Sequence, residues 1–192
     1  MMPRDTRLRQ CRSTDQDALV DIYREGFKGE LSFFFKRFCG CFFEALFHHL
    51  SRDTIVAEVG GEVVGFVIVV RGPMPVARSS ILRLLSTMPT LLTAVRPSFF
   101  AFLLQRTKSM SWRPSQVGIG CIAVESHFRR KGFGRALMRG ALARYHGRNV
   151  TLDVRPWNTG AIRLYSSTGF RRTGVWRDPL GEWVVMSRTP VL

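Results

Sequence analysis

A short basic loop with two glycines is the stretch of this chain whose residue types best suit anion binding. A run of apolar residues ends at Val124, and Gly132 and Gly134 stand where a helix is expected to begin. Glycine lets the backbone approach a phosphate closely, and the free N–H groups and dipole of a first helical turn attract negative charge. Four basic side chains of the same stretch add positive charge: Arg129, Arg130, Lys131 and Arg135. Neither G-x-G-x-x-G nor a Walker loop is present in the sequence, so we expect a phosphate site of another kind.

A second block with polar residues at fixed positions follows one strand later. It runs from Leu152-Asp153-Val154-Arg155 through Asn158 to Tyr165, and Gly169-Phe170 ends it. Residue type alone leaves structural interpretations open here. Asn158 is a favourable helix N-cap, and Tyr165 suits a hydrophobic core.

Together the two blocks resemble the GNAT superfamily of acetyl-coenzyme A-dependent N-acetyltransferases. The family's pyrophosphate motif, Arg/Gln-x-x-Gly-x-Gly/Ala, is matched by Arg129-Arg130-Lys131-Gly132-Phe133-Gly134. The family's block Asn-x-x-Ala-x-x-Leu-Tyr-x-x-x-Gly-Phe is matched from Asn158 to Phe170. The resemblance covers about residues 117–175, and the N-terminal third agrees only in its pattern. It implies transfer of an acetyl group from acetyl-CoA to a primary amine by direct attack.

The resemblance also implies roles for individual residues. The pantetheine arm would pair with the backbone from Ile122 to Val124, and the pyrophosphate would lie on the loop amides from Arg130 to Arg135. Tyr165 would protonate the departing thiolate, and the N–H of Val124 would face the developing oxyanion. The expected acetyl-CoA-binding residues are Ile122, Ala123, Val124, Arg129, Arg130, Lys131, Gly132, Phe133, Gly134, Arg135 and Asn158.

At the usual position of the general base, the sequence departs from the pattern of the family. Many family members carry a glutamate where this chain has Gly118. Ribosomal-protein N-terminal acetyltransferases carry a glutamate in the next strand, in the context Leu-Glu-Val-Arg, and here Asp153 stands there. Asp153 is therefore the candidate base. The alternatives are an ion pair of Asp153 with Arg155 or Arg163, and attack by an amine that is already neutral.

Histidines and cysteines do not form a metal-binding pattern. Cys39 and Cys41 lack a second pair, so we expect no metal. Cys121 falls in an expected central strand and is interpreted as a packing residue. His48 and His49 are interpreted as surface or core residues on an aromatic helix, and proton transfer by either of them is the alternative.

Hydrophobic patterning supplies the elements that must position these residues. It predicts an α/β fold, with a mixed sheet of about seven strands and helices on both faces. The expected strands are Leu8–Arg12, Ile55–Val59, Val63–Val70, Val117–Val124, Val150–Val154, Phe170–Arg177 and Glu182–Ser187. The expected helices are one through Leu19 and Phe27, then Lys36–Leu50, Gly132–Tyr145 and Asn158–Ser167.

Residues 71–116 form an insert that matches no general feature of the superfamily. Ile81 to Val95 keep helical spacing around Pro89, and Pro97 is expected to open a further helix. Two functions suit such a segment: a helical lid over the acceptor pocket, or a basic surface that contacts anionic lipid, a lipid carrier or a partner. We expect residues 1–192 to form a single domain that contains this insert.

Composition narrows the remaining functions. The chain has 192 residues, 45% hydrophobic, which excludes a disordered protein, and its four cysteines exclude a disulfide-dense miniprotein. Basic residues near the N-terminus argue against a signal peptide, so a cytoplasmic protein, monomeric or homodimeric, is expected. The formal charge of +15 suits a phosphate-rich cofactor, and no motif indicates specific nucleic-acid binding.

The sequence leaves the acceptor open among an amino sugar, a small-molecule amine and a protein N-terminus. A binding module for acyl-CoA without catalysis is the alternative function.

Overall fold

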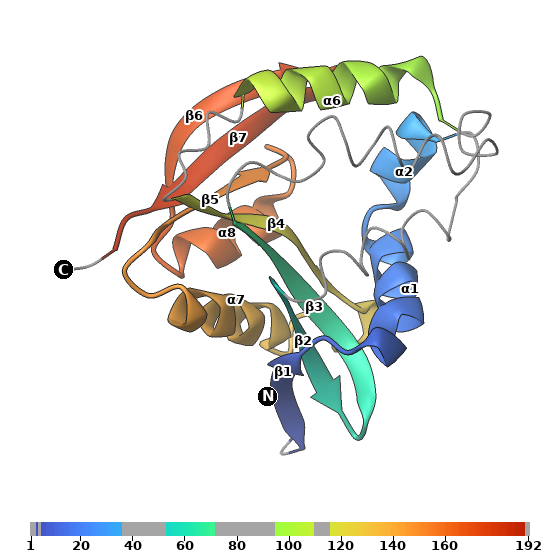
Figure 1. Ribbon diagram of the computed structural model, residues 1–192, viewed down its shortest axis with the longest axis vertical. Coiled ribbons are helices and arrows are strands. Elements are labelled where there is room, and N and C mark those ends of the chain that lie inside the picture. The colour runs from blue at the N-terminus through green and yellow to red at the C-terminus, as the bar shows by residue number, and fades with distance from the viewer. Residues whose placement is uncertain (1–2, 4, 36–52, 72–94, 110–115, 191–192) are drawn as a thin grey trace.

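The computed structural model describes residues 3, 5–35, 53–71, 95–109 and 116–190, and these form one twisted seven-stranded sheet (Figure 1). The strands lie in the order β1-β2-β3-β4-β5-β7-β6, and β4–β5 is the one parallel pair among them. Their bounds are β1 Thr6–Gln10, β2 Thr54–Val59, β3 Glu62–Arg71, β4 Gln116–Val124, β5 Asn149–Val154, β6 Arg171–Asp178 and β7 Gly181–Arg188.

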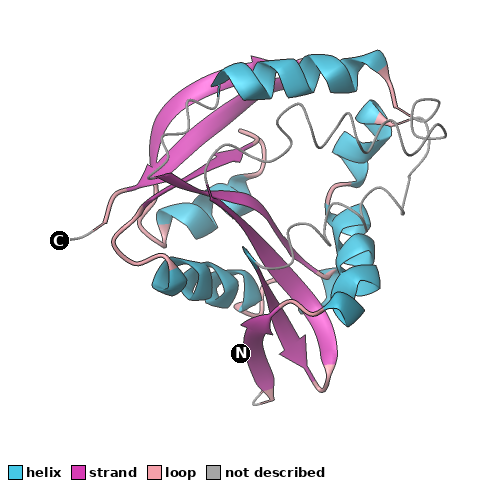
Figure 2. Cartoon of the chain, viewed as in Figure 1, coloured by secondary structure: helices cyan, strands magenta, loops and turns pink. Residues whose placement is uncertain are grey.

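Helices cover both faces of this sheet, as the patterning predicts (Figure 2). The α-helices are α1 Gln16–Gly26, α2 Lys28–Phe34, α6 Pro97–Ser109, α7 Phe133–Arg144 and α8 Thr159–Ser166, and the short 3-10 helices are η1 Ser13–Asp15 and η3 Ser126–Phe128. Alternation along β3 sends its side chains to two separate cores. On one side Val67 and Val69 meet Leu137 of α7 and Tyr165 of α8, which we call the α7–α8 core. On the other side Phe66 and Ile68 meet residues of α1 and α2, which we call the α1–α2 core.

The sheet opens between β4 and β5. These strands pair from Gln116 to Ile119 and from Asn149 to Leu152, and β4 then continues to Val124 without β5 beside it. Against β3, Ile119 pairs with Val69 and Cys121 pairs with Ile68, so Gly120 is the extra residue of a β-bulge. A bulge bends its strand and increases the local twist. The separation begins at this bulge, and we attribute it to the bend.

Two expectations on the N-terminal side differ from the structure. The first strand lies two residues earlier, and the first helix ends at Gly26, after which the separate helix α2 begins at Lys28. Glycine is unfavourable in a helix, and Phe27 leaves the helical conformation while its ring stacks on Tyr23 at 4.6 Å. The break turns Phe27 toward the interior of the molecule, where its side chain lines a cavity.

The insert is described in part. The helix predicted to open at Pro97 is confirmed as α6, and Phe35 forms an isolated β-bridge with Val95. Phe102 of α6 packs against Phe34 of α2 at 4.9 Å and against Trp176 of β6 at 6.2 Å. The predicted helix Lys36–Leu50 and the periodic stretch from Ile81 lie outside the described residues. Within the described residues, no helix has the length and apolar content needed to cross a membrane.

Candidate active site

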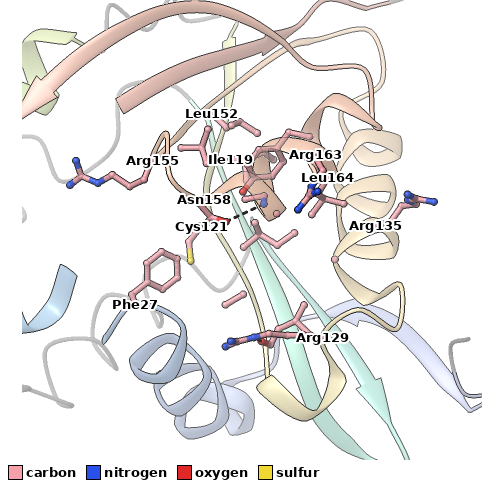
Figure 3. A pocket seen from close by; sticks show the side chains of 18 of the residues that line it. Phe27, Ile119, Cys121, Arg129, Arg135, Leu152, Arg155, Asn158, Arg163 and Leu164 are labelled. Atoms are coloured by element: carbon pink, nitrogen blue, oxygen red, sulfur yellow. Dashed lines mark hydrogen bonds between the residues drawn. The ribbon is translucent and has the colours of Figure 1, made fainter. Parts of the chain in front are cut away.

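A cavity of about 810 Å³ occupies the opening between β4 and β5 (Figure 3). Its walls come from the separated ends of β4 and β5, the loop before α7, and α8. Three further side chains come from elsewhere in the chain: Phe27 and Glu30 from the α1–α2 region, and Trp183 from β7. The cavity therefore joins both predicted sequence blocks with residues that lie far from them in sequence.

The basic loop has the backbone geometry of an anion cradle. Gly132 has a φ of 98°, and Arg130 has a φ of 64°, a left-handed conformation that costs a non-glycine residue roughly 1–2 kcal/mol. Gly132 is the N-cap of α7, and it provides no side chain to cap the first N–H groups of that helix. A Cβ atom on Gly134 would lie 3.2 Å from Leu164 of α8, so the glycine also allows the two helices to approach closely. The helix start is thus open toward the cavity.

The end of β4 presents backbone polar groups to the same cavity. The N–H of Glu125 donates to the carbonyl of Val64 at 3.0 Å, on the β3 side. Since strand N–H groups alternate between the two edges, the N–H of Val124 points to the other edge, where β5 has separated. The carbonyl of Val124 accepts a hydrogen bond from Nε of Arg129 at 2.8 Å, and the Arg129 guanidinium lies 3.5 Å from Glu25 of α1. Arg129 therefore supports the strand end at the entrance of the cavity.

The expected acetyl-CoA-binding residues divide into two groups in the structure. Arg129, Arg130, Gly132, Gly134 and Arg135 line the cavity, together with Ile122, Ala123, Val124 and Asn158. The side chain of Phe133 lies in the α7–α8 core instead, with 1% exposed. Lys131 is not part of the lining, and its Nζ lies 5.2 Å above the ring of Phe128. The backbone groups of Phe133 and Lys131 can contribute to the cradle, but the buried side chain of Phe133 cannot contact a ligand there.

Asn158 and Tyr165 are placed at the same cavity by α8. The Oδ1 atom of Asn158 accepts from the N–H of Ala161 at 3.1 Å, which confirms its role as an N-cap and leaves its amide NH2 group for a ligand. Tyr165 is 6% exposed, and burial, together with the neighbouring Cys121, raises the pKa of its hydroxyl. Among the described residues no hydrogen bond to this hydroxyl is present, although it lines the cavity. The Tyr165 hydroxyl is thus protonated at neutral pH, and Tyr165 lines the cavity.

Asp153 also lines the cavity and is half-buried. Both terminal nitrogens of Arg155 donate to Asp178, at 3.0 and 2.8 Å. The ion pair of Arg155 is therefore with Asp178, and not with Asp153 as one alternative from the sequence had it. The ion pairs of the described residues do not include Arg163, which lines the cavity from α8. Asp153 and Glu30 are the two acidic side chains of the lining.

Several lining residues were not singled out from the sequence. Phe27, Glu30 and Trp183 reach the cavity through the packing of distant elements, and no local motif marks them. Cys121 is interpreted from the sequence as a packing residue. Burial raises the pKa of its thiol, and because the thiolate is the nucleophile, this makes Cys121 a poor nucleophile. In Figure 3 its sulfur points toward the ring of Phe27, on the side away from Arg135 and Arg163. His48, His49, Cys39 and Cys41 lie outside the described residues, and within those residues no group of three metal-ligating side chains comes together.

A comparison with family models decides the identity suggested by this geometry. The model of the acetyltransferase (GNAT) family matches residues 17–170. This chain belongs to the GNAT family. The match extends beyond both sequence blocks: it includes nearly all of α1, then α2, β2 and β3, and every residue of the cavity lining except Trp183.

Individual relatives are consistent with membership of this GNAT family. An N-alpha-acetyltransferase of Sulfurisphaera tokodaii is 28% identical over 178 residues, which cover 91% of this chain and 85% of the relative. The N-alpha-acetyltransferase RimI of Mycobacterium tuberculosis is 38% identical over 64 residues, 33% of this chain and 40% of that protein. The solved structure of yncA from Salmonella typhimurium "with its cofactor Acetyl-CoA" has the same fold, with a TM-score of 0.63 at 16% identity over 97% of this chain and 94% of that one.

Proposed function

We propose that this GNAT protein transfers an acetyl group from acetyl-CoA to a primary amine, and that the amine is the N-terminal α-amino group of a protein. The observation that carries the proposal is the opening between β4 and β5. An anion cradle lies along its border, and a buried, protonated tyrosine lies in the same cavity.

The residues present suit acetyl-CoA. The uncapped start of α7, with Arg130, Arg135 and Arg163 around it, matches the charge of a pyrophosphate. The unpaired edge of β4 from Ile122 to Val124 matches the amide groups of a pantetheine arm. When bound, acetyl-CoA supplies the activated acyl group, and the protein supplies binding, orientation and proton transfer.

Three side-chain and backbone groups then have separate roles in transfer. The N–H of Val124 stabilises the negative charge that develops on the acyl oxygen. Tyr165, which is protonated at neutral pH, donates its hydroxyl proton to the leaving sulfur as the carbon–sulfur bond breaks. Asp153 accepts the proton that the amine loses, either directly or through one water molecule.

The distribution of charge in the lining supports an amine acceptor. The arginines at the cradle are Arg129, Arg130, Arg135 and Arg163, whereas the two acidic side chains are Glu30 and Asp153. A positively charged α-ammonium group is attracted by the carboxylates and repelled by the cradle. The names of the two relatives favour a protein N-terminus over an amino sugar.

The experiment that tests this proposal is a thiol-release assay with acetyl-CoA and a panel of amines. The panel contains peptides with a free N-terminus, the same peptides with the N-terminus blocked and a lysine present, and a free amino sugar. We expect thiol release with the free N-termini and acetylation at the α-amino group by mass spectrometry. Release with the amino sugar alone would contradict the choice of acceptor. Binding of acetyl-CoA without any transfer would favour the non-catalytic module, which Gly118 at the usual base position would then explain.

A further inference from the structure

A buried cluster of charged and aromatic side chains joins the end of β5 to the turn between β6 and β7. Arg155 is 3% exposed and forms two hydrogen bonds to Asp178, the last residue of β6. Nε1 of Trp183 donates to the same carboxylate at 2.7 Å, and the Arg155 guanidinium lies 3.8 Å from the centroid of the Trp183 ring. The N–H of Leu180 also donates to Asp178, at 2.8 Å. We call Arg155, Asp178 and Trp183 the clamp.

Helix α6 of the insert contacts the clamp through aromatic side chains. Trp183 stacks on Trp176 with centroids 5.6 Å apart and an angle of 7° between the rings. Trp176 in turn contacts Phe102 of α6. A continuous row of aromatic contacts therefore runs from α6 to the guanidinium of Arg155.

The clamp borders the part of the cavity that lies away from the cradle. Arg155 and Trp183 line this cavity, as do Phe27 and Glu30 on the α1–α2 side. Leu180, within the turn that Asp178 holds, packs against the α1–α2 core. Leu180 of the β6–β7 turn and Phe27 of the cavity lining thus pack against the same core.

Stability alone is a poor explanation for this cluster. Burying two charges requires the loss of their hydration, and replacing such a pair with apolar residues of similar size is often neutral or stabilising. The Nε atom of Arg155 is buried and finds no acceptor among the described residues, so the pair does not even satisfy its own hydrogen bonds. What the charged pair provides is directionality, because a two-bond guanidinium–carboxylate contact fixes both partners in orientation.

We infer that the clamp is a positioning device for the acceptor: it holds Trp183 and the β6–β7 turn as one wall of the acceptor-binding part of the cavity. Arg155, Asp178 and Trp183 are positioning residues and take no part in proton transfer. The inference rests on the proposed function, and it predicts that the clamp controls the KM for the acceptor while leaving the affinity for acetyl-CoA unchanged.

The test compares four proteins: the parent, the double variant Arg155→Met with Asp178→Leu, the variant Trp183→Phe, and the control Arg177→Ala. The double variant replaces the pair by apolar residues together, which avoids leaving one buried charge without its partner. Trp183→Phe keeps an aromatic ring but removes the hydrogen bond to Asp178. Arg177 belongs to the same hairpin, where it makes an exposed 3.5 Å ion pair with Glu182, so its removal breaks an ion pair of that hairpin without touching the clamp. The acceptor probe is whichever free-N-terminus peptide the parent acetylates fastest, and acetyl-CoA affinity is measured by calorimetry.

We expect the KM for the acceptor to rise about tenfold or more in the folded double variant and about threefold in Trp183→Phe. In the control Arg177→Ala this KM should stay within about twofold of the parental value. The affinity for acetyl-CoA should be equal in all four proteins. A folded double variant with the parental acceptor KM would overturn the inference, and so would an equal loss of acetyl-CoA affinity. If the double variant does not fold, an unchanged KM in Trp183→Phe overturns it. Absence of transfer by the parent would overturn the proposed function and the clamp together, whereas transfer by the parent with no effect of the variants overturns the clamp alone.

Discussion

At the scale of single residues, burial keeps the hydroxyl of Tyr165 in its protonated form at the cavity. Its hydroxyl is removed from solvent, and desolvation raises its pKa, so the group stays protonated through neutral pH and can donate. An ordinary tyrosine is also protonated at neutral pH, so the raised pKa keeps the donor form populated without making the hydroxyl a stronger acid. The donor role proposed for Tyr165 therefore rests on the position of its hydroxyl at the cavity, which Asp153 also lines.

Tyr165→Phe should lower kcat by about 10²–10⁴-fold, because that is the usual contribution of a general acid or base. Acetyl-CoA affinity and thermal stability should change little, since the hydroxyl makes no hydrogen bond among the described residues. Steady-state thiol release and a melting curve measure these quantities. Tyr145→Phe is the matched control, because its hydroxyl bonds to Asp53, away from the cavity. A loss of less than about threefold in kcat for Tyr165→Phe would leave Tyr165 a packing residue.

Gly134→Glu should abolish measurable acetyl-CoA binding, a weakening of at least about 100-fold, because a carboxylate would face the pyrophosphate at the cradle. Gly140→Glu on the same helix is its steric control. A Cβ atom there would lie 3.2 Å from a methyl carbon of Leu8, the same approach that Gly134 would have to Leu164. Calorimetric titration of both folded variants with acetyl-CoA measures the difference. Equal affinities would show that the cradle lies elsewhere.

At the scale of elements, the entry to α1 depends on a buried carboxylate. Asp15 accepts two hydrogen bonds from the Arg9 guanidinium of β1, and one from the N–H of Arg12 at 2.6 Å. Burial acts to raise the pKa of Asp15, but these hydrogen bonds and the charge of Arg9 outweigh it, and the net effect lowers the pKa. The charged form is therefore favoured in the folded state, and the pair connects the first strand to the first helix.

Asp15→Asn should lower the free energy of unfolding at pH 7 by about 3 kcal/mol, the lower end for breaking a buried pair, because Arg9 keeps Glu58 as a partner. A carboxylate with a lowered folded-state pKa stabilises the fold above its unfolded pKa of about 4, and this stabilisation is lost as the pH falls through the folded pKa. The difference between parent and variant should therefore shrink in acid. Urea unfolding of both proteins from pH 7 to pH 3 measures it, and a difference that stays constant over this range would contradict the assignment.

At the scale of the whole molecule, part of the excess positive charge lies at the cavity, where an anionic donor would enter. The formal charge of the chain is +15, and four exposed arginines, Arg129, Arg130, Arg135 and Arg163, line the cavity. Charge of one sign around a cleft raises the rate at which oppositely charged ligands arrive. We therefore expect these arginines to speed the association of an anionic donor.

The association rate constant of acetyl-CoA should accordingly fall roughly tenfold between 0.01 and 0.3 M salt, because the screening length shrinks over this range to less than the width of the site. Stopped-flow fluorescence measures the rate. Dephospho-CoA, which lacks one phosphate, should show a weaker dependence. A rate constant independent of salt for both ligands would mean that steering plays no part.

The sequence by itself determined the parts of this protein that depend on neighbouring residues. The glycines before α7 and the N-cap Asn158 act within one turn of backbone, so their residue types and spacing suffice to predict a phosphate cradle and the start of α8. The alternation of apolar residues likewise predicts the seven strands, each of them to within about two residues at each end.

Only the tertiary structure decided where the cavity opens and what completes it. A bulge at Gly120 shifts the register of β4, and an apolar periodicity contains no information on such a shift. Phe27, Glu30 and Trp183 reach the cavity from separate elements, and Arg155 pairs with Asp178 across 23 positions rather than with the nearer Asp153. Contacts of this kind follow from the order of strands in the sheet, and that order is set by the burial of the whole chain rather than by any local pattern.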